Sequence, residues 1–189
     1  MDTGIFDRED LENKLILVNE QDEVLGESGK IEAHQKGLLH RAFSIFIFNT
    51  RGELLVQQRA LEKYHSGGMW ANTCCGHPYP LEDTLKAAER RLFEELYINV
   101  SLKKEFTTRY TAELDNGLSE NELVHVYYGL YDDSIRPNPK EAMNWSWFNL
   151  DELKVAVKEN PAEYAFWFRF YINEHFEEIL TMQEKILQK

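Results

Sequence analysis

The chain has 189 residues, of which 43% are hydrophobic and 13% aromatic, so it can build the core of one ordinary domain and is not disordered. It has 21 Lys and Arg residues and 33 Asp and Glu residues, which gives a net charge of −12. This negative charge disfavours nucleic acid and anionic membrane surfaces as partners. An anionic small molecule would therefore bind only where cations gather locally.

The two cysteines, Cys74 and Cys75, are adjacent, and neighbouring residues rarely meet disulfide geometry. A reducing compartment fits this usage better than secretion. The N-terminal residues are acidic, and no apolar run is long enough to span a bilayer. We therefore expect a cytoplasmic protein without membrane contact, a monomer or weak dimer, with residues 1–189 forming one domain and 1–13 a flexible arm.

The first half of the chain predicts short strands. Leu15–Val18 is followed by a turn at 19–22 and a partner strand at Val24–Leu25. Ala42–Phe48 and Leu54–Gln57 form a hairpin, because Asn49–Gly52 supplies turn residues between them. Residues 65–68 then form a glycine-rich loop, which we expect to be flexible.

The second half predicts helices among further strands. Leu81–Leu96 has apolar residues at helical spacing, with Asp83 or Thr84 as the N-terminal cap. Further strands are expected at 106–112, 123–131 and 145–148, a helix at 151–158 and a final aromatic-rich helix from Pro161 to about Lys185. This order predicts an α/β sandwich with a C-terminal helix.

The helix at 81–96 carries the most specific motif of the chain. Its spacing resembles the Nudix box, G-x5-E-x7-R-E-U-x-E-E-x-G-U with U aliphatic, and the matching positions are Gly76, Glu82, Arg90, Leu92, Glu94, Glu95 and Ile98. The resemblance implies a Nudix-like α/β/α sandwich with a mixed sheet. The alternative without a catalytic role is an acidic amphipathic helix whose charged face is simply solvated.

The box is broken at two positions, where Arg91 replaces Glu and Tyr97 replaces Gly. Replacing a carboxylate by a guanidinium removes a metal ligand and adds a group that binds phosphate oxygens bidentately. Binding of a diphosphate survives this change, whereas metal-activated attack by water is impaired. The alternative for Arg91 is a simple salt bridge to Glu95, one helical turn away.

Several residues near this helix in the sequence could bind a metal ion. Alternation along an extended chain puts Cys75 and His77 on one side and Cys74 on the other, and it sends Glu120 and Glu122 one way. With His34 and His40, which flank a short loop, three histidines and two glutamates could hold Zn²⁺, Mn²⁺ or Mg²⁺. The other histidines, His65, His125 and His175, have no such setting.

The sequence as a whole resembles type I isopentenyl-diphosphate isomerase over about residues 14 to 170. The resemblance rests on five segments in the same order as in that family: 39–44, 54–60, 70–78, the degenerate box and 120–123. The most specific part is Cys75-Gly76-His77-Pro78, which runs directly into the Nudix-like helix.

The resemblance implies interconversion of isopentenyl and dimethylallyl diphosphate through a tertiary carbocation, in isoprenoid biosynthesis. It assigns the proton transfers to Cys75 and Glu122, with Tyr110 working beside the glutamate. By the same resemblance, the divalent ion (Mn²⁺, Mg²⁺ or Zn²⁺) is held by a set of five ligands: His34, His40, His77, Glu120 and Glu122.

The resemblance also implies groups for the cation and for the diphosphate. Trp167 lies near the tryptophan that stabilises the carbocation, although the family often has two residues between the Phe and the Trp, which here abut; the alternative is a core residue. Glu95 matches a carboxylate that holds Mg²⁺ against the diphosphate. The diphosphate-binding cations match Lys30, Arg59, Lys63 and Arg91.

Two other functions compete with this interpretation. A Nudix hydrolase of a nucleoside diphosphate derivative would explain the helix, but it leaves Cys75, His77 and the glutamate pair without roles. A non-catalytic Nudix-fold module would require a site that has lost its activity, which the full set of residues argues against.

Overall fold

The computed structural model describes residues 11, 13–63, 65–113 and 117–188. The expected flexible arm at 1–13 lies, apart from Leu11 and Asn13, outside the described residues. The strands are β1 (Lys14–Val18), β2 (Val24–Gly29), β3 (His40–Phe48), β4 (Leu54–Arg59), β5 (Trp70–Ala71), β6 (Cys74–Gly76), β7 (Lys103–Glu113), β8 (Ser119–Leu130) and β9 (Ala142–Phe148). The helices are α2 (Lys30–Lys36), α3 (Thr84–Leu96), α4 (Leu150–Glu159), α5 (Phe166–Glu174), α6 (Phe176–Leu187) and a 3₁₀ turn (Pro161–Glu163).

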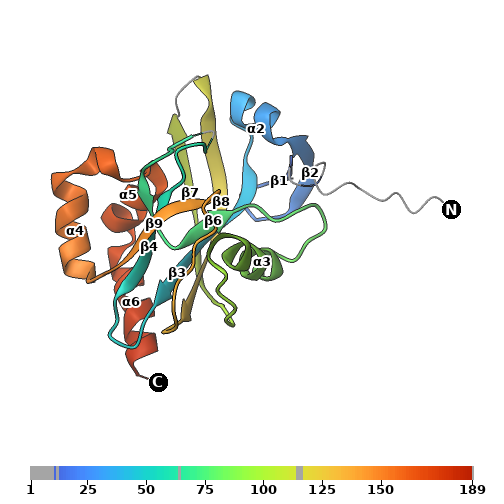
Figure 1. The fold of residues 1–189 in the computed structure, drawn as a ribbon. Helices are drawn as coiled ribbons and strands as arrows, with labels where there is room; N and C mark the ends of the chain where they lie inside the picture. Colours follow the sequence, from blue (N-terminus) through green and yellow to red (C-terminus); the bar gives the residue numbers. More distant parts are fainter. Residues whose placement is uncertain (1–10, 12, 64, 114–116, 189) are drawn as a thin grey trace.

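Strand β3 is the centre of a mixed sheet (Figure 1). It pairs in parallel with β8 over its whole length and antiparallel with β6 on its other side. Strands β1 and β4 join its ends, and β7 extends the sheet beyond β8. The parallel pair brings the start of β3 next to the start of β8, two segments more than 80 residues apart in sequence.

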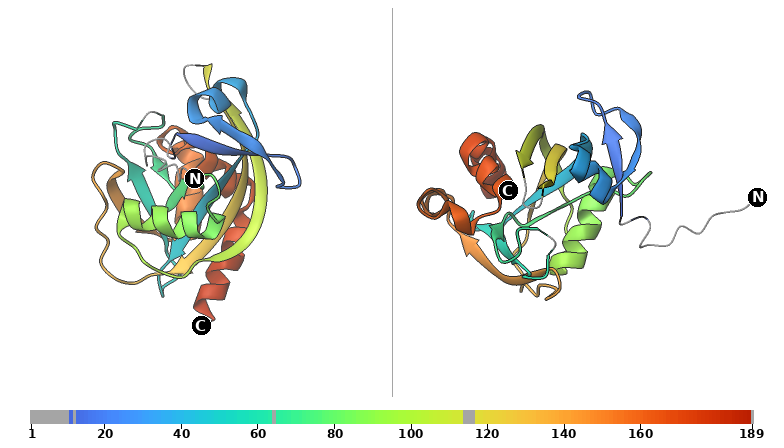
Figure 2. Two further views of the ribbon diagram at one scale, coloured as in Figure 1. Left: turned by 90° about the vertical axis from the view of Figure 1, so that its right-hand side faces the viewer. Right: turned by 90° about the horizontal axis from the view of Figure 1, so that it is seen from above.

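Side chains of β3 alternate between two hydrophobic cores. Phe43 and Ile45 pack with α3 on one face of the sheet, whereas Phe46 and Phe48 pack with α5 and α6 on the other. All four side chains are fully buried, as expected for a strand covered on both faces. Figure 2 shows the helices on the two sides of the sheet, so the predicted α/β/α sandwich is confirmed.

Helix α3 begins and ends as its sequence requires. The side chain of Asp83 caps it by accepting a hydrogen bond from the backbone N–H of Lys86. Tyr97 ends it in the left-handed conformation, with φ 54°, a conformation that costs least for the glycine found in the regular Nudix box. The departure at Tyr97 therefore keeps the backbone of the box.

Two segments differ from the sequence-based expectation. Residues 30–36, for which no helix is expected, form α2, which ends at Gly37 with φ 60°. The single helix expected after Pro161 is two helices, because His175 leaves the helical conformation, with φ −128° and ψ 26°. His175 instead hydrogen-bonds Thr108 of β7 through Nε2, at 2.9 Å. No helix in the described ranges is long and apolar enough to cross a membrane.

Candidate active site

A cavity of about 310 Å³ opens beside the sheet at the start of β8. Most residues predicted for the site line it: Lys30, Arg59, Lys63, Cys75, His77, Arg91, Glu95, Tyr110, Glu120, Glu122 and Trp167. The other two, His34 and His40, are buried directly behind Glu120. The structure thus brings every predicted site residue together.

Strand register explains why these residues meet. Directly paired residues of neighbouring strands point to the same face of a sheet. His40 of β3 is paired with Glu122 of β8, Glu122 with Tyr110 of β7, and Ser44 of β3 with Cys75 of β6. Because positions 40 and 44 of β3 share one face, all five side chains lie on the side covered by α5.

Three imidazoles and two carboxylates form a compact buried group, the His/Glu cluster. Its closest approaches are 2.8 Å between His77 Nε2 and Glu122 Oε1 and 3.1 Å between His34 Nε2 and Glu120 Oε2. His40 Nε2 lies 3.8 Å from Glu120 and 3.7 Å from Glu122. The donor atoms fall into two groups that share His40, namely His34/His40/His77 and His40/Glu120/Glu122, and the atoms of each group lie within 4.8 Å of one another, close enough to hold a metal ion.

The tautomers of two histidines follow from their backbone contacts. Nδ1 of His34 lies 2.6 Å from the carbonyl of Lys30, and Nδ1 of His40 lies 2.8 Å from the carbonyl of Leu38. Because a carbonyl only accepts, Nδ1 donates in both rings and Nε2 faces the carboxylates. His40 Nε2 is buried without any hydrogen-bond partner among the described residues.

Burial and neighbouring charges push the pKa values of the cluster apart. Burial raises the pKa of Glu120, and the charge of Glu122 adds to the effect. Burial also opposes ionisation of Glu122, but His40 and His77 outweigh it and hold its pKa well below the usual range. Burial lowers the pKa of His77 to about 4. Two nearby carboxyls with opposite shifts are typical of acid–base chemistry.

The two cysteines lie on opposite faces, as alternation predicts. Cys74 is fully buried in the core beneath α3, while Cys75 lines the cavity. Burial raises the pKa of the Cys75 thiol to about 12, so the sulfur carries its proton at neutral pH. Ser44, opposite Cys75, also lines the cavity and accepts a hydrogen bond from the Tyr171 hydroxyl at 3.0 Å.

Tyr110 is tied to Glu122. Its hydroxyl donates to Oε2 of Glu122 at 2.6 Å, and its ring packs against Phe166 and Phe170 of α5. Burial and the charge of Glu122 raise the pKa of Tyr110 well above its ordinary value. The tyrosine is therefore a neutral donor to the carboxylate.

Trp167, at the start of α5, presents its indole to the cavity. Its N–H donates to Oδ1 of Asn72 at 3.2 Å, which fixes one edge of the ring. The guanidinium carbon of Arg59 lies 5.1 Å from the ring centroid. The indole face can therefore receive a cation, although the same residue also belongs to the α5 core.

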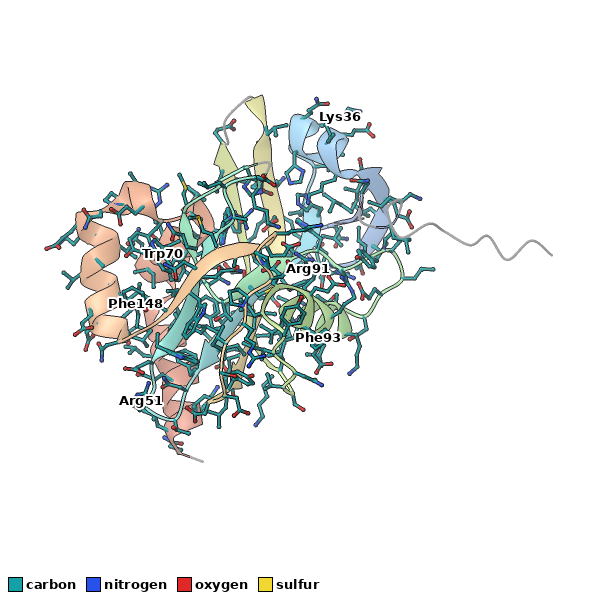
Figure 3. The ribbon with its side chains drawn as sticks, viewed as in Figure 1. Lys36, Arg51, Trp70, Arg91, Phe93 and Phe148 are labelled. Carbon is teal, nitrogen blue, oxygen red and sulfur yellow. The ribbon has the colours of Figure 1, made fainter. Side chains whose placement is uncertain are left out.

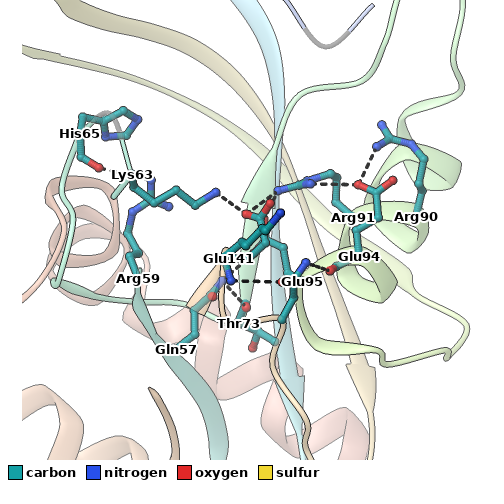
Figure 4. A network of polar contacts seen from close by, with 12 residues as sticks. Gln57, Arg59, Lys63, His65, Thr73, Arg90, Arg91, Glu94, Glu95 and Glu141 are labelled. Carbon is teal, nitrogen blue, oxygen red and sulfur yellow. Dashed lines mark hydrogen bonds and ion pairs between the residues drawn. The ribbon is translucent and has the colours of Figure 1, made fainter. Parts of the chain in front are cut away.

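The other end of the cavity is a network of ion pairs (Figure 4), here called the cation end. Arg91 reaches Glu94 at 2.9 Å, Glu95 at 2.5 Å and Glu141 at 3.2 Å, and Lys63 also pairs with Glu141. The expected Arg91–Glu95 salt bridge is thus present, and Arg91 lines the cavity as well. Figure 3 shows that Arg91 and Phe93 leave α3 in different directions.

Two further cations border the cavity, Arg59 and Lys30. Arg59 is 9% exposed, and its Nε is buried without a hydrogen-bond partner among the described residues. Its Nη2 donates to the carbonyl of His65 at 3.4 Å. Burial lowers the pKa of Lys30. Arg59 therefore keeps donors available for an anion in the cavity.

Sequence reasoning missed several residues that line the cavity, and two of them, Glu141 and His65, bear on its chemistry. Glu141 precedes β9, outside any motif, and it meets Lys63 and Arg91 only in the folded chain. His65 lies in the loop between β4 and β5, close to Glu120 and Trp167. The only sequence signal for His65 was its place in a glycine-rich loop between two matching segments.

Comparisons with known proteins agree on one family. The model of the NUDIX domain matches residues 38–169. The chain is 49% identical to "Isopentenyl-diphosphate Delta-isomerase" of Pectobacterium atrosepticum, over 82% of this chain and 87% of that protein. It is 48% identical to "Isopentenyl-diphosphate Delta-isomerase 2" of Aromatoleum aromaticum, over 83% of each chain.

Solved structures show the same fold at low sequence identity. A crystal structure of a Deinococcus radiodurans protein superimposes with a TM-score of 0.69 at 19% identity, covering 85% of this chain and 97% of that one. A MutT protein from Methanosarcina mazei gives a TM-score of 0.60 at 19% identity, covering 74% and 93%.

Proposed function

The chain belongs to the isopentenyl-diphosphate Delta-isomerases of the NUDIX domain family, and we propose that Cys75 and Glu122 exchange the protons of their reaction. The enzyme interconverts isopentenyl diphosphate and dimethylallyl diphosphate. The observation that carries the residue assignment is that Cys75 and Glu122 line one cavity from the two strands, β6 and β8, that flank β3. The single domain over 1–189, the cytoplasmic location and the monomeric or weakly dimeric state stay predictions from the sequence.

The His/Glu cluster fits a divalent metal ion. Buried carboxylates need a compensating charge, and His40 Nε2 faces them without a hydrogen-bond partner in the described part of the chain. The backbone carbonyls that accept from Nδ1 of His34 and His40 orient these rings, as carbonyls behind the histidine ligands of metal sites commonly do. We assign Mn²⁺, Mg²⁺ or Zn²⁺ to this cluster, with His34, His40, His77, Glu120 and Glu122 as ligands.

An acid that protonates an alkene must be strong, because an alkene is a very weak base. When bound, a divalent cation at the cluster makes a proton on Glu122 more acidic. Tyr110 donates the 2.6 Å hydrogen bond to Oε2 and so orients that carboxyl. Glu122 and Tyr110 therefore form the proton-transfer pair on the β8 side of the cavity.

The second proton is exchanged on the β6 side. Strands β6 and β8 flank β3 on its two edges, so Cys75 and Glu122 enter the cavity from different directions. A flat five-carbon alkene between them could gain a proton on one side and lose one on the other. Each positioned acid or base of this kind contributes about 10²–10⁴ in rate.

The tertiary carbocation between the two steps needs a partner that is electron-rich but not nucleophilic. The indole of Trp167 meets this need, and a cation over a desolvated indole gains about 2 kcal/mol. The approach of the Arg59 guanidinium to the same ring supports this role. Water must be kept from the cation, because it would trap it as an alcohol.

The diphosphate is assigned to the opposite end of the cavity. Lys30, Arg59, Lys63 and Arg91 provide the local positive charge that a chain of net charge −12 requires. Glu95, which lines the cavity beside Arg91, is assigned to Mg²⁺ on the diphosphate.

Hydrolysis by the Nudix mechanism is not the better alternative. At position 91, where the regular box has a metal-binding glutamate, Arg91 pairs with Glu94, Glu95 and Glu141. Hydrolysis would also leave the cavity position of Cys75 without a purpose.

The test is incubation of the protein with isopentenyl diphosphate and Mg²⁺, followed by assay for an acid-labile allylic product. We expect dimethylallyl diphosphate without release of phosphate. Glu122→Gln should abolish the product while the circular dichroism spectrum is unchanged. Release of inorganic phosphate or diphosphate at the rate of turnover would contradict the proposal.

A further inference from the structure

His65 contributes a ring to the cavity that the proposed chemistry has not yet used. It lies in the loop between β4 and β5, and its side chain is 14% exposed. Its neighbours in the cavity are Glu120 of the His/Glu cluster and Trp167 of α5. This partly buried ring lines the cavity beside both the metal-binding group and the indole, next to the part of the cavity assigned to the alkene.

The loop holds this ring in a defined place. The backbone N–H of Arg59 donates to the carbonyl of Met69, and that of Gly68 donates back to Arg59, so both ends of the loop are tied together. A Cβ at Gly67 would come within 2.4 Å of the carbonyl oxygen of Leu61, so only glycine allows this close fold. In Figure 4, His65 lies on the same side of the network as Arg59 and Lys63.

The contact of His65 with Trp167 is edge-to-face. The ring centroids are 5.6 Å apart and the planes are inclined by 83°, a geometry preferred by aromatic pairs. By contrast, Nε2 of His65 lies 3.9 Å from Glu120 Oε1, which is beyond hydrogen-bond distance. The packing contact is therefore the stronger of the two.

The indole is also held at other points. It packs in the α5 core, and the guanidinium carbon of Arg59 lies 5.1 Å from the ring centroid. At its edges, the indole N–H donates to Asn72 on the β5–β6 side, whereas His65 contacts the ring from the loop. The His65 contact therefore adds a restraint on the tilt of the ring at the edge that faces the loop.

We propose that His65 is a positioning residue that packs edge-on against Trp167 and holds the indole face toward the branched carbon of the substrate. The inference rests on the proposed function, because it gives Trp167 the carbocation as its partner. A tilted indole would stabilise the cation less and would leave room for water. The diphosphate binds at the cation end, so its binding would be the same as in the wild type.

The experiment compares His65→Ala with His65→Phe, which keeps a ring but removes both nitrogens. For His65→Ala we expect kcat to fall about tenfold, the order of the loss of one aromatic pair, with KM changed less than about threefold. The fraction of turnovers that ends in the tertiary alcohol diphosphate, formed when water adds to the cation and releases a proton, should rise. His65→Phe should restore kcat and lower the alcohol fraction.

Controls separate this inference from the proposed function. Leu61→Ala changes an exposed side chain of the same loop and should behave as the wild type. A wild-type chain that makes no dimethylallyl diphosphate would overturn the proposed function and this inference with it. If the wild type isomerises, two results would overturn the inference alone. In the first, His65→Ala has the kcat and the alcohol fraction of the wild type. In the second, His65→Phe is as impaired as His65→Ala.

Discussion

The two ends of the cavity solve the problem of buried charge in different ways. In the His/Glu cluster, Glu120 and Glu122 face imidazoles, and His40 Nε2 has no hydrogen-bond partner among the described residues. At the cation end, Arg91 and Lys63 already pair with carboxylates. The cluster needs a bound cation to balance its charges, whereas the cation end is balanced by its own residues.

This difference has a consequence for binding. A metal ion entering the His/Glu cluster gains ligands that have few competing partners. A diphosphate entering the cation end must compete with Glu141 and Glu95 for Arg91 and Lys63. Arg59, whose Nε has no partner among the residues that the structure describes, offers an anion a donor with less competition than Arg91 or Lys63 does.

The largest effect is expected at the thiol that faces the cavity. Cys75→Ala should lower kcat by about 10³-fold or more, because it removes one of the two proton-transfer groups. The matched control is Cys74→Ala, which removes the neighbouring thiol from the core under α3 and should leave kcat within about threefold. Equal losses in the two variants would refute the assignment of Cys75.

Metal removal should affect the His/Glu cluster next. Dialysis against a chelator should abolish isomerisation and lower Tm, since an ion bound only to the folded state stabilises it by mass action. Addition of Mn²⁺, Mg²⁺ or Zn²⁺ singly, with calorimetry as the readout, would identify the ion. A Tm that is the same with and without chelator would argue against a structural contribution of the metal.

At the cation end, we expect substitutions of Arg59 and Arg91 to have different effects on KM and Tm. Arg59→Gln should raise KM for isopentenyl diphosphate about tenfold with little change in Tm, because the side chain has donors to spare. Arg91→Gln should lower Tm more, since it leaves the buried carboxylate of Glu95 without its guanidinium. Steady-state kinetics and thermal melts of both variants make the comparison; the reverse pattern would contradict it.

The smallest effect is expected from the pH dependence of Glu141. Burial alone would raise its pKa, but Arg91 and Lys63 outweigh it and lower the pKa below 4.5. The carboxylate therefore contributes stability that is present above pH 4.5 and is lost as the pH falls through the folded-state pKa. Melting curves between pH 6 and pH 3 should show a smaller acid-induced loss for Glu141→Gln than for the wild type.

Local patterns in the sequence were sufficient for much of the fold. Alternation separated Cys74 from Cys75, and Asp83 was one of the two cap candidates, with Thr84, because both effects act within a few residues. Helix α2 was not predicted because it has only seven residues and lies between two glycines, Gly29 and Gly37. The break at His175 depends on its contact with Thr108 of a distant strand, which no local pattern reports.

By itself, the sequence determined the fold class and the family, and it predicted residues that the fold brings together at one cavity, since motif spacing and side-chain periodicity are properties of neighbouring positions. Only the tertiary structure decided that Glu141 forms ion pairs with Lys63 and Arg91 and that His65 packs on Trp167. These contacts join residues 50 to 102 positions apart, and they exist because strand register and loop closure set distances that the order of residues along the chain does not encode.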